Sequence, residues 1–305
     1  MAKPYFVIVN PTSGNGKSKR NWSKIQQLLI ENNIEFIAEV TQFPSHSKAL
    51  ARKAILSGYR HIICVGGDGT VHNVINGIMS QTTCPSNTIH LGVIPIGTGN
   101  DWARSYDIPK NLSAAVKIIA KDRVNHQDIG KIELLNPKGS IVYFNNLVGV
   151  GFDGLVVSKV QKYKYLGGIA YFLGTLQSLV KAKNFRCAIT TNSLQLSTRT
   201  LMVLTGLCRY SGGGMQLTNS PDPKDALFDI SIAENLTSID IIRNLSRLYN
   251  GTISKSKKVI TSKSDFIKIT ILEKPLPYIE ADGELIGSGG MQISIVPRAL
   301  TFYSP

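Results

Sequence analysis

Short apolar segments alternate with amphipathic ones over the first 125 residues, and this alternation constrains the fold more than any other feature of the chain. Segments rich in Val, Ile and Phe predict strands, and apolar residues at helical spacing predict helices between them. The strands are expected at 5–9, 35–40, 61–65 and 91–96, and the helices at 17–31, 47–57 and 71–80. Because strands that alternate with helices form parallel sheets covered on both faces, we expect an N-terminal α/β domain.

The pattern changes near residues 121–127. Later segments resemble strands joined by turns, which is typical of antiparallel β-structure, and two helical stretches interrupt them at 155–181 and 239–249. The strands are expected at 129–135, 140–150, 185–191, 194–204, 228–233, 266–272 and 291–296. With 305 residues, the chain is about twice the usual domain length. We therefore predict one domain at 1–125 and a second at 126–305, and leave open that the last residues return to the first.

Composition indicates a folded protein of a reducing compartment. Hydrophobic residues make up 43% of the chain and charged residues 18%, which excludes disorder as the main state. No apolar stretch is long enough to span a membrane, and residues 5–9 are too short for the core of a signal peptide. The four cysteines lie far apart without CxxC spacing, so we expect neither a zinc site nor a disulfide framework. These features predict a cytoplasmic protein.

Three glycine-containing loops follow predicted strands of the first domain. The loop Gly66-Gly67-Asp68-Gly69-Thr70 precedes a predicted helix, so its backbone can approach a phosphate and the helix N–H groups can bind it. Asp68 would repel that phosphate unless a divalent cation lies between them, which favours a magnesium nucleotide. A plain turn with an N-cap residue is the alternative. The loops 10–16 and 97–101 follow the first and fourth strands, so all three should converge at one edge of the sheet.

A fourth glycine pattern, GxGxxG at 149–154, follows another predicted strand. A dinucleotide site would need an acidic residue about 20 positions later, within a βαβ unit. The chain has no acidic residue from Gly154 to Pro221, so this pattern indicates a turn or bulge.

The motifs together resemble those of the diacylglycerol kinase catalytic-domain family, especially the bacterial diacylglycerol kinases and YegS-like lipid kinases. The resemblance is carried by residues 10–14, 66–70 and 97–101 and by Asp282-Gly283-Glu284, in the family's order along nearly the whole chain. It implies a nucleotide domain like those of NAD kinases and phosphofructokinases, followed by an antiparallel β-sandwich domain that binds the lipid substrate. The implied activity is transfer of the ATP γ-phosphoryl group to a lipid hydroxyl.

The resemblance also implies roles for individual residues. Asp282 matches the family's proposed general base, and a turn after a short predicted strand at 278–280 is a suitable position for it. An ordinary Asp-Gly hairpin turn is the alternative. The residues expected to bind ATP are Asn10, Pro11, Thr12, Ser13, Gly14, Thr41, Gly66, Gly67, Asp68, Gly69, Thr70, Asn73 and Thr98.

A structural Mg²⁺ is implied on Asp222, Asp225 and the carbonyl of Leu227, with an ordinary loop as the alternative. Two positions depart from the family pattern. Asn73 stands where the family commonly has Glu, and Ala226 stands where it usually has Gly, so both departures could change nucleotide or metal affinity. The expected cofactors are thus ATP and Mg²⁺.

The net charge of +14 predicts an anionic partner. The acid-free segment combines apolar residues with Lys159, Lys162 and Lys164, so 155–181 is a candidate docking face for anionic lipids, with a core helix as the alternative. We expect reversible peripheral membrane association and no nucleic-acid partner, and leave a homodimer open. Two rival functions remain: a kinase of a soluble acceptor such as NAD or a sugar phosphate, and a non-catalytic protein that binds nucleic acid or other anions.

Overall fold

The computed structural model describes residues 4–136, 138–160, 178 and 182–305. The chain divides into two compact units, which are considered separately below. The N-terminal unit contains Met1–Gln127 and Arg298–Pro305, and the C-terminal unit contains Asp128–Pro297. The last strand, β15 (Met291–Tyr303), therefore begins in the second unit and ends in the first.

The N-terminal unit is built on a parallel sheet. Its strands lie in the order β2 (Phe36–Val40), β1 (Tyr5–Val9), β3 (His61–Gly66) and β4 (His90–Pro95), and the end of β15 pairs in parallel with β4. All residues of β1 are buried, as expected for a strand covered on both faces. Every strand predicted for this unit is confirmed to within one residue at each end.

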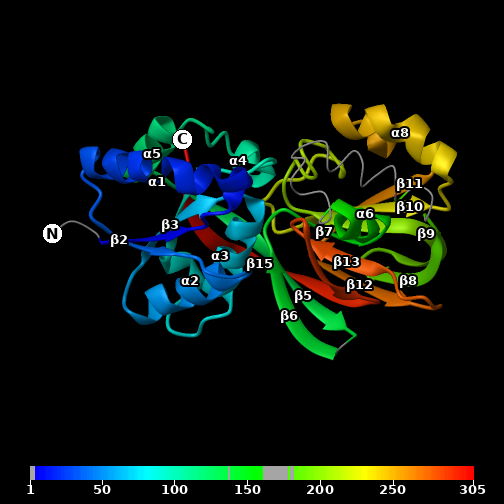
Figure 1. The fold of residues 1–305 in the computed structure, drawn as a ribbon. Coiled ribbons are helices and arrows are strands. Elements are labelled where there is room, and N and C mark those ends of the chain that lie inside the picture. The colour runs from blue at the N-terminus through cyan, green and yellow to red at the C-terminus, as the bar shows by residue number, and fades with distance from the viewer. Residues whose placement is uncertain (1–3, 137, 161–177, 179–181) are drawn as a thin grey trace. The chain divides into compact units, whose positions relative to one another are not determined.

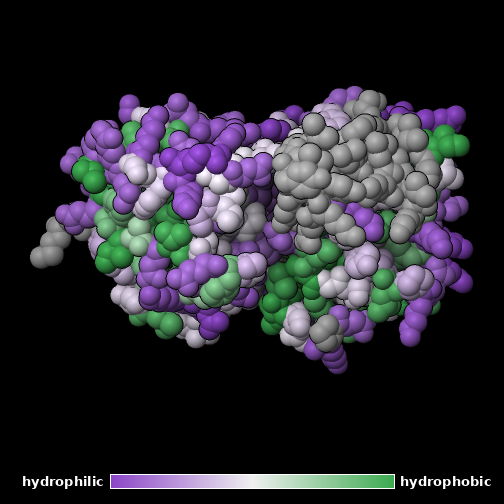
Figure 2. All heavy atoms as spheres, viewed as in Figure 1, coloured by the Kyte–Doolittle hydropathy of each residue, from purple (hydrophilic) through white to green (hydrophobic). Residues whose placement is uncertain are grey.

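Helices cover both faces of this sheet. In Figure 1, α1 (Ser13–Glu31) and α5 (Leu112–Ala120) lie over one face, and α2 (His46–Leu56) and α3 (Asp68–Met79) lie over the other. Two shorter elements, η1 (Ser86–Thr88) and α4 (Asp101–Ser105), complete the unit. On the visible face, mostly hydrophilic side chains surround single apolar ones, which is ordinary for a protein surface (Figure 2).

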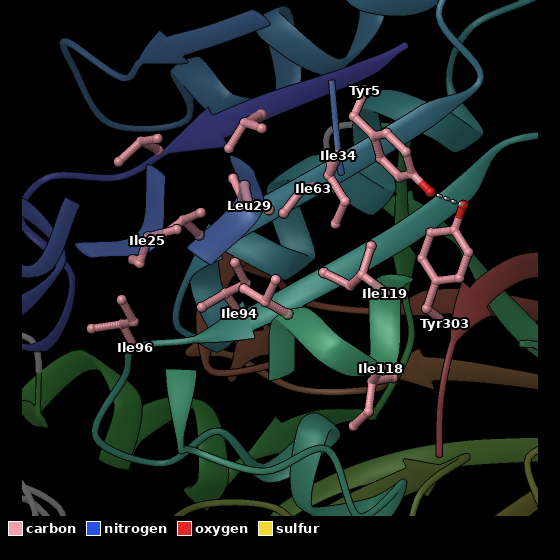
Figure 3. Packing of buried hydrophobic residues seen from close by; sticks show 14 residues of the cluster. Tyr5, Ile25, Leu29, Ile34, Ile63, Ile94, Ile96, Ile118, Ile119 and Tyr303 are labelled. Carbon is pink, nitrogen blue, oxygen red and sulfur yellow. Dashed lines mark hydrogen bonds between the residues drawn. The ribbon is translucent and has the colours of Figure 1, made fainter. Parts of the chain in front are cut away.

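The core beneath α1 and α5 is aliphatic. Ile25 and Leu29 of α1 pack with Ile119 of α5 against Ile63 and Ile94 of the strands, and all five side chains are at most 1% exposed (Figure 3). At the margin of this cluster, the hydroxyl groups of Tyr5 and Tyr303 are hydrogen-bonded at 3.4 Å. Each end of the unit's chain is thereby anchored to the same core.

The C-terminal unit is antiparallel, and the expected fold class is confirmed. A continuous strand order runs β14-β13-β7-β9-β8-β12-β15. Off this path, β10 pairs with β9 and β11, and β5 pairs with β6 and β15. The further strands are β5 (Val124–Leu135), β6 (Lys138–Phe144), β7 (Leu147–Gly151), β8 (Phe185–Thr191), β9 (Gln195–Gly206), β10 (Phe228–Glu234), β11 (Val259–Ser264), β12 (Phe266–Ile271), β13 (Tyr278–Ala281) and β14 (Glu284–Ser288). The helices among the described residues of this unit are α6 (Phe152–Val160), α8 (Ser238–Asn250) and η3 (Ile253–Lys255).

The structure departs from the predicted elements at several points. The single strand expected at 140–150 is wrong, because the chain breaks at Asn145-Asn146 between β6 and β7. The elements α5, β11 and β14 were not expected. Of the helical region expected at 155–181, α6 covers the beginning, and most of the remainder, including Lys162 and Lys164, lies outside the described residues. Within the described residues, no helix is both long and apolar enough to cross a membrane.

Candidate functional site

The loop after β1 is joined by hydrogen bonds to the loop after β3. Asn10 donates from Nδ2 to Oγ1 of Thr70 at 2.9 Å, and its Oδ1 accepts from the backbone N–H and hydroxyl of Thr12 at 3.2 and 2.9 Å. The hydroxyl of Ser13 lies 3.4 Å from that of Thr70. Asn10 and Thr70 thus hold the first two glycine-containing loops together, and Pro11 lies within the linked segment.

The same loop continues through three left-handed residues. Gly14, Asn15 and Gly16 have φ of 59°, 54° and 78°, so the regular part of α1 begins near Lys17, as the sequence predicted. Gly14 also faces the next loop closely, because a Cβ there would lie 3.2 Å from the carbonyl oxygen of Ile96. A residue with a side chain at this position would be both strained and crowded.

The loops after β3 and β4 touch through their backbones. A Cβ on Gly97 would lie 2.7 Å from Cα of Gly67 and 2.5 Å from Oδ1 of Asn100. A Cβ on Gly66 would lie 2.5 Å from Oγ1 of Thr70. These glycines are therefore required by close approach, and the convergence of the three loops at one sheet edge is confirmed.

Asp68 points toward the loop after β4. Its Oδ2 accepts the backbone N–H of Asn100 at 2.7 Å, and its Oδ1 accepts that of Trp102 at 3.4 Å. Desolvation of the carboxylate, and then the negative charge of Asp101, raise the pKa of Asp68 to about 6. The geometry gives Asp68 a role that the sequence did not predict, which is to bind the N-terminus of α4 and fix the spacing of the glycine loops.

The remaining predicted nucleotide contacts lie at or near the same edge. The backbone N–H of Thr41 donates to the carbonyl of Val9 at 2.8 Å, so Thr41 adjoins the end of β1. Thr98 is exposed in the loop after β4, and Gly69 lies in the first turn of α3. Asn73 donates from Nδ2 to the carbonyl of Gly69 at 2.8 Å, so its amide bonds back to its own helix.

In the C-terminal unit, Asp282 occupies a tight hairpin turn between β13 and β14. Asp282 and Gly283 have φ of 51° and 82°, as in the Asp-Gly turns that favour hairpins. Oδ1 of Asp282 accepts the backbone N–H groups of Asn146 and Leu147 at 2.9 and 3.2 Å, and Oδ2 accepts that of Asn145 at 3.1 Å. The N–H of Asp282 in turn donates to the carbonyl of Leu147 at 2.8 Å. The turn therefore has the form of an Asp-Gly hairpin turn, which was the alternative interpretation of Asp282. Its carboxylate, however, is held in one orientation.

The break at Asn145-Asn146 supplies these donors, and the sequence reasoning missed its role. A continuous strand would direct its N–H groups alternately to opposite sides, whereas the broken chain directs three consecutive ones to one carboxylate. The carbonyl of Asn146 accepts from the backbone N–H of Leu207 at 2.8 Å, which fixes the break from the other side. Two adjacent asparagines within an apolar segment were the available signal for a turn.

The loop expected to bind a structural Mg²⁺ holds a lysine instead. Nζ of Lys263 donates to Oδ2 of Asp225 at 2.9 Å and lies 3.6 Å from Oδ2 of Asp229, and these carboxylates raise the pKa of Lys263. Oδ1 of Asp222 and of Asp225 accept the backbone N–H groups of Lys224 and Leu227, each at 3.0 Å. With an ammonium on Asp225 and both aspartates bonded to N–H groups of their own loop, these residues do not fit a resident metal ion.

We expect the folded chain to be insensitive to free Mg²⁺. In thermal unfolding without nucleotide, exchanging EDTA for millimolar MgCl₂ should change the Tm by less than about 1 °C, because the loop at 222–227 gives the native state no preferential site for the ion. Lys263→Met frees the carboxylates of Asp225 and Asp229, so its Tm should rise with Mg²⁺. The control is Lys268→Met, at an exposed lysine of β12. If Mg²⁺ raised the Tm of the unaltered protein by several degrees, the result would support the predicted metal site.

Ala226 adopts a left-handed conformation with φ of 59°, and its backbone N–H donates to Oδ2 of Asp128 at 2.8 Å. Because the Cβ is unfavourable in this conformation, Ala226→Gly should stabilise the protein by about 0.5–1 kcal/mol in urea unfolding. The control, Ala49→Gly at an exposed position of α2, should destabilise it by about 1 kcal/mol. Equal destabilisation by both substitutions would show that the loop relaxes around Ala226.

Comparison with known proteins agrees with both units. Residues 4–132 match the model of the diacylglycerol kinase catalytic domain, and residues 146–304 match that of the YegS C-terminal NAD kinase beta sandwich-like domain. The latter match alone covers more than half of the chain.

Curated relatives are similar over nearly their whole length. The chain is 29% identical to a protein of Bacillus subtilis (strain 168) with the provisional name lipid kinase YtlR, over 97% of this chain and 98% of the relative. It is 28% identical to a diacylglycerol kinase of the same strain over 93% and 90%, and 26% identical to that of Mycobacterium tuberculosis (strain ATCC 25618 / H37Rv) over 98% and 94%.

Among solved structures, a provisionally named diacylglycerol kinase from Bacillus anthracis str. Sterne matches with a TM-score of 0.80 and 25% identity, over 99% of this chain and 97% of the other. Another structure from that organism, described as a diacylglycerol kinase, has a TM-score of 0.73 and 22% identity over the same shares, which supports the fold. The family matches and relatives therefore set aside the non-catalytic alternative. The chain belongs to the diacylglycerol kinase catalytic-domain family, with a YegS-type C-terminal domain, and is a kinase.

Proposed function

We propose that the protein transfers the γ-phosphoryl group of ATP to the hydroxyl of a membrane lipid, with diacylglycerol as the acceptor and phosphatidic acid as the product. The observation that carries the proposal is the carboxylate of Asp282, which three backbone N–H groups hold in one orientation on a rigid turn. The names of the curated relatives support the choice of diacylglycerol.

In the proposed reaction, Asp282 accepts the proton of the lipid hydroxyl while the hydroxyl oxygen bonds to the γ-phosphorus. The bond from that phosphorus to the bridging oxygen of ADP breaks, and ADP leaves with the negative charge. Phosphoryl transfer depends mainly on positioning and charge neutralisation, so a fixed carboxylate acts chiefly by aligning the attacking oxygen. Magnesium enters with ATP, as part of the nucleotide substrate.

The glycine loops of the N-terminal unit are proposed to bind the triphosphate. Gly66, Gly67 and Gly97 let the backbone approach phosphate oxygens closely, and the first N–H groups of α3 lack partners within the helix. The side chains of Asn10 and Thr70 keep the loops in register. Catalysis then requires that the bound triphosphate and Asp282 act on the same acceptor.

Reversible attachment to anionic membranes is proposed to deliver the lipid. The acid-free sequence from Gly154 to Pro221 carries lysines beside apolar residues, and each basic residue near an anionic surface contributes about 1 kcal/mol. Lys159 lies in the last turn of α6, whereas Lys162 and Lys164 lie outside the described residues. Membrane attachment of this kind is an expectation from sequence.

A panel of acceptors tests the proposal. ADP formation is measured with MgATP and, in separate reactions, mixed micelles of diacylglycerol, a sphingoid base or a polyprenol, and soluble NAD or a sugar phosphate. The proposal predicts that diacylglycerol gives the highest kcat/KM. Turnover with only one of the other lipids would show that this lipid is the acceptor in place of diacylglycerol. Turnover with only NAD or a sugar phosphate would favour the rival function, a kinase of a soluble acceptor.

A further inference from the structure

The GxGxxG pattern at 149–154 has a structural purpose in the C-terminal unit. A Cβ on Gly149 of β7 would lie 2.5 Å from Oδ2 of Asp153, so the absence of a side chain leaves room for this carboxyl group. A Cβ on Gly154 would lie 2.7 Å from the carbonyl oxygen of Tyr278, so α6 lies directly on the backbone of β13. The glycines thus bring Asp153, in the first turn of α6, against the strand that precedes Asp282.

A second carboxyl group lies at the same place. Glu280 of β13 is 2% exposed and pairs across the sheet with Gly149. The carboxyl groups of Glu280 and Asp153 lie close enough together that each changes the pKa of the other. Within the described part of the chain, the buried Oδ2 of Asp153 meets no nitrogen or hydroxyl donor, so a proton on Glu280 is the donor available to this pair.

The surroundings favour one retained proton. Desolvation, and then the neighbouring Asp153, raise the pKa of Glu280 well above its ordinary value, and desolvation also raises the pKa of Asp153. Among the described residues, the titratable or charged groups on the elements packed around the pair are Lys159 of α6, Tyr278 of β13, Arg199 of β9, Asp282 of the turn and Glu284 of β14. Of these, Asp282 adds negative charge that further raises the pKa of Glu280.

Glu280 also contacts the turn that carries Asp282. Its Oε2 accepts the backbone N–H of Gly283 at 2.8 Å. Gly283 follows Asp282 in the left-handed turn, so one hydrogen bond joins the carboxyl pair to the backbone beside the proposed base. Protonated Glu280 can donate from one oxygen to Asp153 and accept from Gly283 with the other.

We propose that Asp153 and Glu280 share one buried proton and act as a positioning pair, holding the Asp282-Gly283 turn in the orientation that phosphoryl transfer requires. The proposal rests on the function proposed above, because it assigns a role to residues behind Asp282. Loss of the shared proton places two negative charges in the interior beside a third, which weakens the turn. Activity should therefore fall as the pH rises through the raised pKa of the pair.

Two substitutions at Glu280 separate this role from simple packing. Glu280→Gln keeps an oxygen that accepts the N–H of Gly283 and an amide N–H that donates to Asp153, but its side chain does not titrate. Its kcat at pH 7 should stay within about threefold of the unaltered protein, and its decline in activity with rising pH should move to higher pH. Glu280→Ala removes the bond to Gly283 and leaves Asp153 without its donor. Its kcat should fall on the order of 10- to 100-fold, with the KM for ATP nearly unchanged.

Stability gives a readout that does not depend on the lipid reaction. Because the pKa of Glu280 is raised in the folded state, its contribution to stability is fully present below the unfolded-state pKa and is lost as pH rises through the folded-state pKa. The Tm of the unaltered protein should therefore fall more than that of Glu280→Gln as the pH rises from about 5 through the raised pKa of Glu280. Glu133→Gln, at a partly exposed residue of β5, is the control and should follow the unaltered protein.

The two readouts keep the outcomes distinct. If the unaltered protein phosphorylates no acceptor but the Tm profiles diverge as predicted, the proposed function fails and the shared proton stands without a catalytic role. Parallel Tm profiles of the unaltered protein and Glu280→Gln would overturn the shared proton. A Glu280→Gln protein as inactive at pH 7 as Glu280→Ala would overturn the positioning role.

Discussion

Replacing Asp282 by Asn is expected to lower kcat for lipid phosphorylation by roughly 10²- to 10⁴-fold. An amide cannot accept the proton of the attacking hydroxyl. It also presents one oxygen instead of two to the N–H groups of Asn145, Asn146 and Leu147, so the side chain loses its orientation. Steady-state kinetics with saturating ATP and lipid measure the loss in kcat.

The affinity for ATP separates this effect from unfolding. Isothermal titration should give Asp282→Asn a Kd for ATP within about twofold of the unaltered protein, because its glycine loops are intact. Asp265→Asn, at an exposed position before β12, is the control and should leave kcat unchanged. A kcat for Asp282→Asn within threefold of the unaltered value would show that Asp282 is not the general base of the reaction.

Gly97→Ala should weaken ATP binding by at least about tenfold, because the new Cβ would lie 2.7 Å from Cα of Gly67 and force the two loops apart. The clash is with backbone, which cannot turn aside as a flexible side chain can. Nucleotide titration followed by intrinsic fluorescence measures the change, since Trp102 lies just after this loop in α4.

The control for Gly97→Ala is Gly287→Ala in β14. There the nearest atom to a new Cβ is a methyl carbon of Leu134 at 3.1 Å, a side chain that can move. Its affinity for ATP should match that of the unaltered protein. If Gly97→Ala also binds ATP normally, the close approach of the loops after β3 and β4 has no part in nucleotide binding.

Much of the N-terminal unit could be predicted from sequence because its signals are local. The apolar residues of Tyr5–Val9 by themselves predict a buried strand. The polar loops that follow parallel strands must lie at one edge of the sheet. The inward orientation of Asp68 could not be predicted. It depends on N–H groups of Asn100 and Trp102, which lie more than thirty residues later in the chain.

In the C-terminal unit, the unpredicted features arise from pairing between distant segments. Apart from the Asn145-Asn146 pair, residues 140–150 have the composition of one strand, and the N–H groups at the break are bonded to the distant Asp282. The spacing of Asp222 and Asp225 suggests a metal loop, but β11 pairs with β10 and places Lys263 opposite Asp229. Contacts between segments so far apart in the chain cannot be inferred from the local sequence.

The arrangement around Asp282 also gives a structural explanation for two sequence motifs. The GxGxxG at 149–154, which the sequence already indicated is not a dinucleotide loop, has glycines that accommodate Asp153 and the backbone of β13. The Asp-Gly turn has the form of an ordinary hairpin turn, but Glu280 and the N–H groups of 145–147 bind it from two sides. These contacts distinguish the Asp282 turn from an ordinary exposed hairpin turn.

The most direct measurement of the central claim follows the γ-phosphate itself. The protein is incubated with γ-labelled MgATP and diacylglycerol in mixed micelles, and the lipid and aqueous phases are separated and counted. We predict label in a phosphorylated lipid with the unaltered protein and almost none with Asp282→Asn. Label that stays in the aqueous phase, or lipid label that is equal for the two proteins, would contradict the account.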